Sequence, residues 1–216
     1  DCVVAGGDQG VNQDWIWVSK CWLPEGHSQL SASEVADKTI MEVIFYGAIQ
    51  RSQVPGYLRK YGVDMCAYDS RPEVADAISL HRNHGVQLGK QVTLVDYDLR
   101  VDQKEHDGKT YILYNFRQED YQDQVLQSFE LLGVDELPLW RLPDSFNRWL
   151  QLRNDERSPV RHLCAMQKDG ELGKWIRPED HVDDYFFAAM FMKLAFRLWL
   201  NSKRKRRSFA MSKSRR

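Results

Sequence analysis

The order of strand-like and helix-like segments is the feature that most constrains the fold of this chain. Runs rich in β-branched and aromatic residues predict strands near 2–7, 14–22, 39–46, 63–69, 91–97 and 110–116. The first three runs follow one another closely, as an antiparallel meander requires, whereas helix-like segments over 53–61 and 71–84 precede the fourth and fifth. The pattern predicts an α/β fold with a mixed sheet, antiparallel in its first three strands and then parallel, flanked by helices.

Further helices and a hairpin are expected in the second half of the chain. Apolar spacing and stop signals predict helices over 119–132, over 144–153 with Asp144 as its cap, and from Glu179 onward. The pair Asp169-Gly170 is a favoured turn sequence, so residues 162–166 and 174–176 are expected to pair around it.

Length and charge predict one folded domain followed by a basic tail. A chain of 216 residues can bury a core without disulfides, and we expect that domain to span residues 1–200. Residues 201–216 hold eight Lys or Arg and no acid, which leaves 22 basic and 31 acidic residues elsewhere. Such a run is typical of a disordered tail, which can still bind phosphates. Because the first residue is Asp1 rather than Met, we expect a piece of a longer polypeptide or a processed product.

The cysteines and the apolar segments indicate a reducing compartment and no membrane partner. The four cysteines show no Cys-x-x-Cys spacing and lie in or beside apolar stretches, which is typical of reduced core thiols. They are Cys2, Cys21, Cys66 and Cys164. The most apolar segment, 185–200, contains Lys193 and Arg197 and is too short and too charged to span a bilayer. We therefore expect a cytoplasmic protein.

Acidic residues stand at the ends of three expected core elements. Asp8 ends the first apolar run, Asp69 ends the fourth, and Asp183 and Asp184 open the last, strongly apolar helix. Ligands collect at strand ends in α/β sheets, so Asp8 and Asp69 need only lie on adjacent strands to face one pocket. Asp184 could reach the same pocket from the helix, on the face that it shares with Ala188.

Each of these acids also has an ordinary structural interpretation. Asp8 follows two glycines and could be a turn residue, and Asp69 precedes Ser70-Arg71-Pro72 and could cap a helix. Acids in the first turn of a helix are favoured by the helix dipole, which would account for Asp183 and Asp184. Their joint placement on separate core elements favours a site.

Carboxylates that converge without a counter-ion repel one another, and divalent cations relieve that repulsion. A ligand set of oxygen atoms favours Mg²⁺ or Mn²⁺ over Zn²⁺. Two such ions, roughly 3.5–4 Å apart, could activate a water and stabilise the leaving oxygen in phosphodiester hydrolysis.

His81 and His84 have no third ligand at metal spacing, and the sequence has no P-loop.

Several other residues have simpler expected roles. Five of the seven tryptophans lie in apolar periodic stretches and are expected to pack in the core: Trp15, Trp17, Trp140, Trp149 and Trp199. Four basic residues near element ends are expected on the side where a cleft would open, where they could contact phosphates. They are Arg71, Lys90, Lys174 and Arg177.

Three segments, in this order, resemble the C-terminal nuclease domain of the large terminase subunit of tailed bacteriophages: Gly6–Asp14, Tyr61–Glu73 and Asp180–Tyr185. The resemblance extends over nearly the whole chain and implies a ribonuclease H-like fold. It implies that Asp8, Asp69 and Asp184 are the catalytic acids, which bind two metal ions, and it offers Asp183 as a fourth ligand. The spacing from His181 favours Asp184 over Asp183.

The same resemblance implies a biological setting. The chain would cut concatemeric double-stranded viral DNA during genome packaging in the host cytoplasm. Its implied partners are the portal protein, the small terminase subunit and an N-terminal ATPase domain that is absent from this chain. An insertion between about Leu99 and Lys109, expected to be a charged hairpin, and the basic tail depart from a minimal nuclease core. Either could control DNA access or contact the portal.

Two other functions remain open from the sequence. Another ribonuclease H-like polynucleotide enzyme, such as a resolvase or transposase, would prefer branched DNA. A module without catalysis would bind DNA or a partner protein through the basic tail and exposed acids and would cut nothing. A sugar kinase or actin-like ATPase is less consistent, because no later glycine-rich phosphate loop follows Asp8.

Overall fold

One mixed sheet organises the molecule in the computed structural model, which describes residues 1–86, 91–96, 103–130, 138–169, 175–178 and 182–213. Within these residues, seven strands form this sheet in the order β8-β5-β4-β1-β2-β3-β9. They are β1 (Cys2–Gln9), β2 (Asp14–Trp22), β3 (Ile40–Ile49), β4 (Met65–Asp69), β5 (Gln91–Asp96), β8 (Tyr114–Asn115) and β9 (Trp140–Arg141).

The strand directions confirm the expected fold class. β1, β2 and β3 form an antiparallel meander, whereas β4 pairs parallel with β1, β5 with β4, and β8 with β5. The order β3-β2-β1-β4-β5 with these directions is that of a ribonuclease H-like sheet. The short strand β9 extends the other edge parallel to β3.

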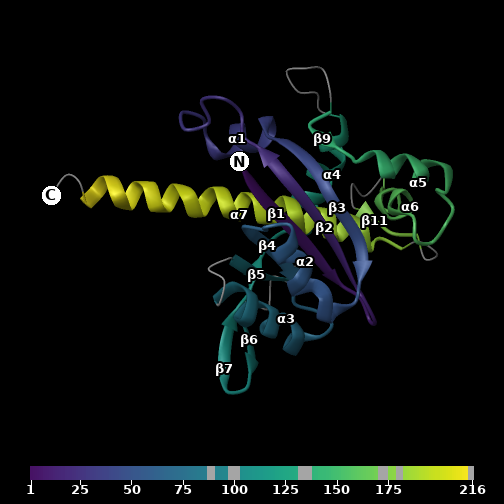
Figure 1. Ribbon diagram of the computed structural model, residues 1–216, viewed down its shortest axis with the longest axis horizontal. Coiled ribbons are helices and arrows are strands. Elements are labelled where there is room, and N and C mark those ends of the chain that lie inside the picture. Colours follow the sequence, from purple (N-terminus) through teal and green to yellow (C-terminus); the bar gives the residue numbers. More distant parts are fainter. Residues whose placement is uncertain (87–90, 97–102, 131–137, 170–174, 179–181, 214–216) are drawn as a thin grey trace.

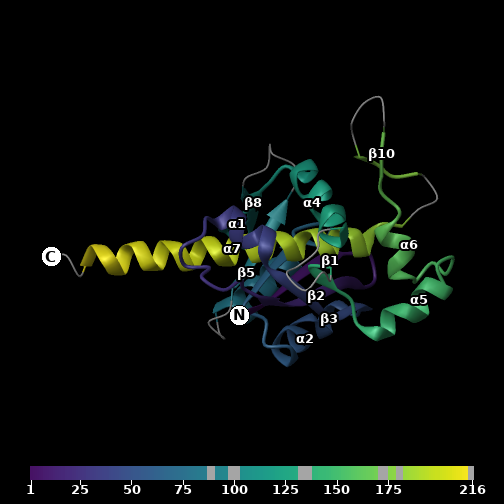
Figure 2. The same ribbon diagram turned by 90° about the horizontal axis from the view of Figure 1, so that it is seen from above.

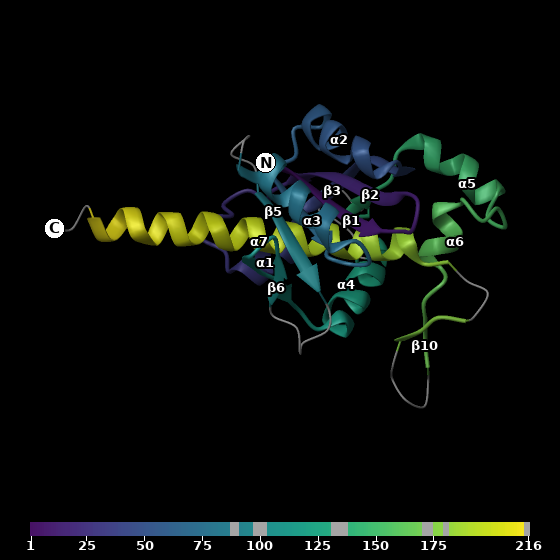
Figure 3. The same ribbon diagram turned by 90° about the horizontal axis from the view of Figure 1, so that it is seen from below.

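Helices cover both faces of the sheet (Figures 1 and 2). They are α1 (Ala32–Lys38), α2 (Val54–Lys60), α3 (Val74–Leu80), α4 (Gln118–Glu130), α5 (Asn147–Gln151), α6 (Pro159–Leu163) and α7 (Asp184–Lys213). α1, α4 and α7 share one buried apolar cluster with the sheet, and α2 and α3 share a second cluster on the other face. Figure 3 shows α5, α6 and β10 at the end of the molecule where α7 begins.

α7 lies against the strands at very short range. A Cβ atom added at Gly6 of β1 would stand 2.0 Å from the carbonyl oxygen of Ala188 and 2.2 Å from the amide nitrogen of Met192. Ala188 and Ala195 are fully buried, as expected for small residues that let a helix approach a sheet. The start of α7 is thereby held beside the ends of β1 and β4.

Short elements complete the fold. Three are short helical segments: η1 (Arg51–Gln53), η2 (His81–Val86) and η3 (Asp144–Phe146). Two are hairpins, one of β6 (Gln103–His106) with β7 (Lys109–Ile112) and one of β10 (Gln167–Lys168) with β11 (Trp175–Ile176). The expected charged hairpin is present from Gln103, and its turn residues Asp107 and Gly108 both have positive φ. Its first residues lie outside the described part.

Several expected boundaries were wrong. Residues 162–166 do not form a strand, because Pro159 starts the helix α6 at a first-turn position, and β10 pairs with β11 instead. The run 110–116 is divided between β7 and β8. Asp144 makes no side-chain cap, and the segment after it is η3 followed by α5. α7 begins at Asp184 rather than near Glu179, although residues 179–181 are not described.

The C-terminal segment differs from the expected disordered tail. α7 continues to Lys213, so residues 201–213 are helical, and this half of the helix extends past the sheet (Figure 1). The division of the chain at residue 200 stays a prediction. Cys2, Cys21 and Cys66 are free and buried, whereas Cys164 is exposed, so the expectation of a core thiol was wrong there. No helix in the described residues is long and apolar enough to cross a membrane.

Candidate active site

β1 and β4 bring Asp8 and Asp69 to neighbouring positions. Their parallel pairing runs from Val4 with Met65 to Gly7 with Tyr68, so the next residues in this register are the two acids. Side chains alternate between faces along a strand, which places both acids on the face of Gly6, the face that packs against α7. Asp69 is buried and Asp8 is half-buried.

The start of α7 adds two more acids. The carbonyl of Asp183 accepts from the amide of Phe187 at 3.1 Å, so Asp183 directly precedes the first turn and Asp184 lies in it. A cavity of about 370 Å³ opens at this point. Its lining residues are Asp8, Gln9, Asp69, Arg71, Pro72, Arg177, Asp183 and Phe187.

The acids lie close enough together to raise the pKa of Asp8 and of Asp184. Burial raises the pKa of Asp8 well above its usual value, and the charges of Asp69, Asp184 and Asp183 raise it further. Burial and the charge of Asp183 raise the pKa of Asp184 to about 6. Such a group is stabilised by protons or by a bound cation, because carboxylates repel one another.

Three of the four acids have a defined polar neighbour. Oδ1 of Asp69 accepts from the backbone amide of Arg71 at 3.0 Å, and α3 starts only at Val74, so Asp69 is not the helix cap that the sequence offered as an alternative. Oδ1 of Asp183 accepts from Nη1 of Arg177 at 2.9 Å. Oδ2 of Asp184 lies 3.6 Å from Nδ1 of His162.

His162 is neutral in this arrangement. Its Nδ1 faces the amide of Tyr185 at 3.3 Å and therefore accepts, which leaves the proton on Nε2, 2.8 Å from the carbonyl oxygen of Glu156. Burial lowers the pKa of His162, in agreement with the neutral form. No sequence pattern pointed to His162, because its position depends on the packing of α6 against α7.

The donor set suits a hard divalent cation. All four candidate ligands are carboxylates, and oxygen ligands are those that Mg²⁺ and Mn²⁺ prefer. However, in the described part of the chain no three His, Cys, Asp or Glu side chains stand together in an arrangement that could hold a metal ion. Because Asp183 accepts from Arg177 and Asp184 lies beside His162, one or both side chains would have to turn toward Asp8 and Asp69.

Two of the four basic residues expected near the cleft line it. Arg71 donates from Nε to Asp96 at 3.0 Å, and Arg177 pairs with Asp183. Asp96 is buried in β5 and also accepts from the Ser70 hydroxyl at 3.2 Å. The rule that led to Asp8 and Asp69, an acid at a strand end, could have found Asp96 too. Lys90, Lys174 and His181 lie outside the described residues.

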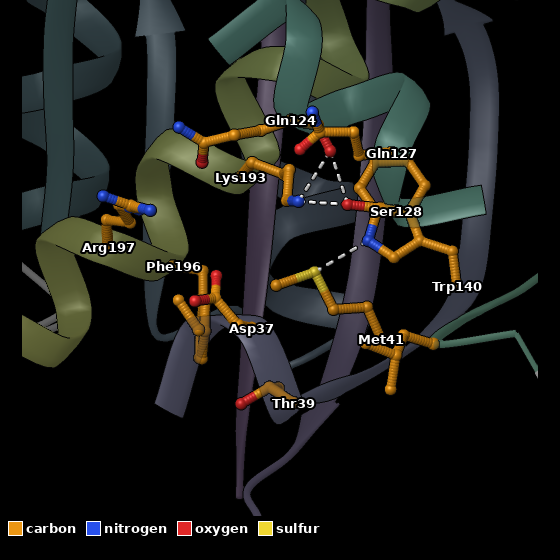
Figure 4. Close-up of a pocket in the computed structure, with 12 residues that line it drawn as sticks. Asp37, Thr39, Met41, Gln124, Gln127, Ser128, Trp140, Lys193, Phe196 and Arg197 are labelled. Atoms are coloured by element: carbon orange, nitrogen blue, oxygen red, sulfur yellow. Dashed lines mark hydrogen bonds between the residues drawn. The ribbon is translucent and has the colours of Figure 1, made fainter. Parts of the chain in front are cut away.

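A second cavity, of about 40 Å³, lies between α1, α4 and α7, away from the acids (Figure 4). Lys193 points into it and donates to the carbonyl oxygen of Gln124 at 2.9 Å and to the hydroxyl of Ser128. Lys193 is therefore covered by α4.

Comparison with known proteins gives similarity of fold. No protein-family model matches the sequence, and no curated protein matches it. Among solved structures, the large terminase nuclease of thermophilic phage G20c with bound magnesium is 12% identical over 89% of this chain and 80% of that chain, with a TM-score of 0.44. The nuclease domain of the large terminase subunit of bacterial virus Sf6 is 11% identical over 89% and 88%, with a TM-score of 0.47.

The chain is similar to phage large terminase nuclease domains. These are structures of the family that the three sequence segments resemble. Thermus thermophilus RuvC is similar as well, at 13% identity over 90% of this chain and 95% of that chain, with a TM-score of 0.37.

Proposed function

We propose that this protein is an endonuclease that hydrolyses phosphodiester bonds of double-stranded DNA with the help of two divalent cations, Mg²⁺ or Mn²⁺. The observation that carries the proposal is the placement of Asp8 and Asp69 at adjacent register positions, with the acids of α7 near enough to raise the pKa of Asp8. Three carboxylates line one cavity, with the charge of Asp184 close enough to act on Asp8, and such a group is costly unless a cation binds there.

The residues take distinct roles in this proposal. Asp8 and Asp69 hold the cations from the sheet, and Asp184 completes the set from α7, with Asp183 as a fourth ligand. Bound cations supply the Lewis acidity that activates a water and stabilises the leaving oxygen. Arg71 and Arg177 line the same cavity, and in this proposal they contact phosphate oxygens of the DNA.

The biological role is proposed from the sequence resemblance. Three segments in the order found in large terminase subunits support cleavage of concatemeric viral DNA during packaging, in the host cytoplasm. On this proposal, the portal protein, the small terminase subunit and an ATPase domain outside this chain are the partners.

Substitution of the acids tests the chemistry. Asp8→Asn, Asp69→Asn and Asp184→Asn should each reduce plasmid cleavage in Mn²⁺ by about a thousandfold or more, because each removes a charged ligand. Asp155→Asn, which removes an acid paired with Arg157 at the surface, should cut like the wild type. Circular dichroism should show that all variants are folded. Cleavage at the wild-type rate by all three site variants would exclude the proposal.

The thermal stability of one variant gives a second check. Since burial and neighbouring acids disfavour the Asp8 carboxylate, Asp8→Asn should melt at or above the wild-type temperature in EDTA. A residue kept for a structural role would show the opposite result, a lower melting temperature.

Asp183→Asn, compared with Asp184→Asn in the cleavage assay, decides which helix acid is the main ligand.

A module without catalysis is the second candidate. It is favoured by the ion pair of Arg177 with Asp183 and by the lack of a three-ligand arrangement among the described side chains. In that case the wild-type protein would bind DNA and cut none at any Mn²⁺ concentration. A resolvase or transposase would instead cut branched DNA faster than linear duplex DNA.

A further inference from the structure

A buried ionic cluster lies behind the candidate site, on the face of the sheet that α2 and α3 cover. Asp14 at the start of β2 is fully buried, and Arg51 of η1 is mostly buried. Arg51 donates from Nε to Asp14 Oδ1 at 3.1 Å, from Nη1 to Asp76 Oδ2 at 3.0 Å, and from Nη2 to the carbonyl oxygen of Gly10 at 2.6 Å. The hydroxyl of Tyr68 donates to the second oxygen of Asp14.

The cluster joins the ends of the two strands that carry the candidate acids. Gly10 lies two residues after Asp8, in the turn between β1 and β2, and Tyr68 directly precedes Asp69 in β4. Asp14 pairs with Gln9 across the β1–β2 ladder. Through Asp14, the guanidinium of Arg51 therefore connects the end of β1 to the end of β4.

The two acids lie at the end of the backbone ladder that joins β1 and β4. The β1–β4 pairing ends at Gly7 and Tyr68, one residue before Asp8 and Asp69. The two carboxylates repel each other, and the charge of Asp69 contributes to the raised pKa of Asp8. Side-chain bridges beyond this last pair add to the contacts that hold the two strand ends together against this repulsion.

Two bridges span the strand ends. The Gln9 amide donates to the carbonyl oxygen of Asp69 at 3.0 Å and accepts from the amide of Glu73 at 3.0 Å. Arg51 provides the other bridge, with charge-assisted bonds, which are stronger than neutral ones. Burial raises the pKa of Asp14, and the hydrogen bonds from Tyr68 and Arg51 oppose that rise.

We infer that Arg51 is a positioning residue for the candidate site: together with Asp14 and Tyr68, it fixes the spacing of Asp8 and Asp69 from the opposite face of the sheet. The inference rests on the proposed function, in which these two acids bind the cations. A lysine at position 51 would keep the charge but could not reach three acceptors in the fixed geometry of a guanidinium. Arg51 touches no substrate and acts only through the strand ends.

Metal affinity tests the inference without any DNA. Isothermal titration of the wild-type protein with Mn²⁺ gives the reference dissociation constant. Arg51→Lys should weaken Mn²⁺ binding by about tenfold, the lower end of what outer partners of metal ligands contribute. Tyr68→Phe removes one bond of the cluster and should weaken binding less, and it serves as the test if Arg51→Lys does not fold.

A matched control separates positioning from general loss of stability. Ser128→Ala removes a hydrogen-bond partner of Lys193 between α4 and α7, far from the acids in the sequence and in a different cavity. It should lower the melting temperature while its Mn²⁺ dissociation constant stays within about twofold of the wild type, since no outer partner of the acids is lost.

The outcomes distinguish the two proposals. Wild-type affinity in both Arg51→Lys and Tyr68→Phe, with clear Mn²⁺ binding by the wild-type protein, would overturn the positioning role alone. Equal weakening by Ser128→Ala at a similar loss of melting temperature would overturn it as well, because the effect would then be one of stability. A wild-type protein that bound no Mn²⁺ would overturn the proposed function and the positioning role together.

Discussion

Lys193 is a charged side chain enclosed between two helices. Its amine donates to the carbonyl oxygen of Gln124 and to the hydroxyl of Ser128, and it lies over the ring of Trp140. Burial, followed by the nearby charge of Arg197, lowers the pKa of Lys193 from 10.5 to about 8. The hydrogen bonds satisfy the ammonium group, but part of its desolvation remains a cost to the folded state.

This cost predicts a pH dependence of stability. Below pH 8 the lysine is protonated in both states, and above about 10.5 it is neutral in both. Between these values the unfolded state binds more protons, so the free energy of unfolding rises with pH, by about 3 kcal/mol at most. Urea unfolding from pH 7 to pH 10 should show this contribution in the wild type and not in Lys193→Met. Parallel curves for the two proteins would contradict it.

At the scale of elements, the contact between β1 and α7 determines whether the site can form. α7 carries Asp183 and Asp184 at its start, and it reaches the sheet only because Gly6 has no side chain. The backbone of α7 around Ala188 cannot move away without also displacing the buried residues on either side of it.

Gly6→Ala should therefore be strongly destabilising. The added methyl would overlap backbone atoms of α7, and we expect a loss of at least about 3 kcal/mol in the free energy of unfolding, at the upper end for overpacked cores. Gly56→Ala is the matched control, because nothing lies within 4 Å of its added Cβ and it sits in the helix α2. That variant should gain about 0.5–1 kcal/mol. Urea denaturation measures both, and equal stabilities would refute the close approach of helix and strand.

At the scale of the whole molecule, α7 connects two regions of opposite charge. It begins at the acidic cavity and ends in the segment 201–213, which has Lys and Arg but no Asp or Glu. The helix extends past the sheet in this second half (Figure 1). A polyanion such as DNA would be attracted to the basic end and repelled by the acids unless cations bind there.

Removal of the basic end should weaken DNA binding in a salt-dependent manner. Truncation after Ser202 removes eight Lys or Arg residues. The plot of the logarithm of the DNA-binding constant against the logarithm of salt concentration should become less steep by several units. Each lost phosphate contact reduces the magnitude of that slope by about 0.9. Fluorescence anisotropy with a labelled duplex at several salt concentrations measures the slope, with Arg157→Gln as a control for an exposed arginine elsewhere. An unchanged slope in the truncated protein would show that the segment does not contact DNA.

Local patterns in the sequence determined the elements and the candidate acids. The mixed sheet was predicted because the first three strand-like runs are close together in the sequence and the next two are preceded by helix-like segments. Asp8 and Asp69 were selected because each is an acid at the end of an expected strand. Strand periodicity and glycine stops are local properties of the sequence, so they predict strands and helices without any knowledge of which segments pack together. The same locality explains the errors at residues 162–166, where a buried helix and a strand have similar apolar content.

Only the tertiary structure decided which side chains meet. Three contacts at the site join segments from different elements. They are the register pairing that sets Asp8 beside Asp69, the ion pair of Asp183 with Arg177, and the approach of His162 to Asp184. The Arg51 cluster behind the sheet depends on the same packing. These contacts arise because helices and strands bury apolar faces against one another, and that packing brings distant polar groups together as a consequence.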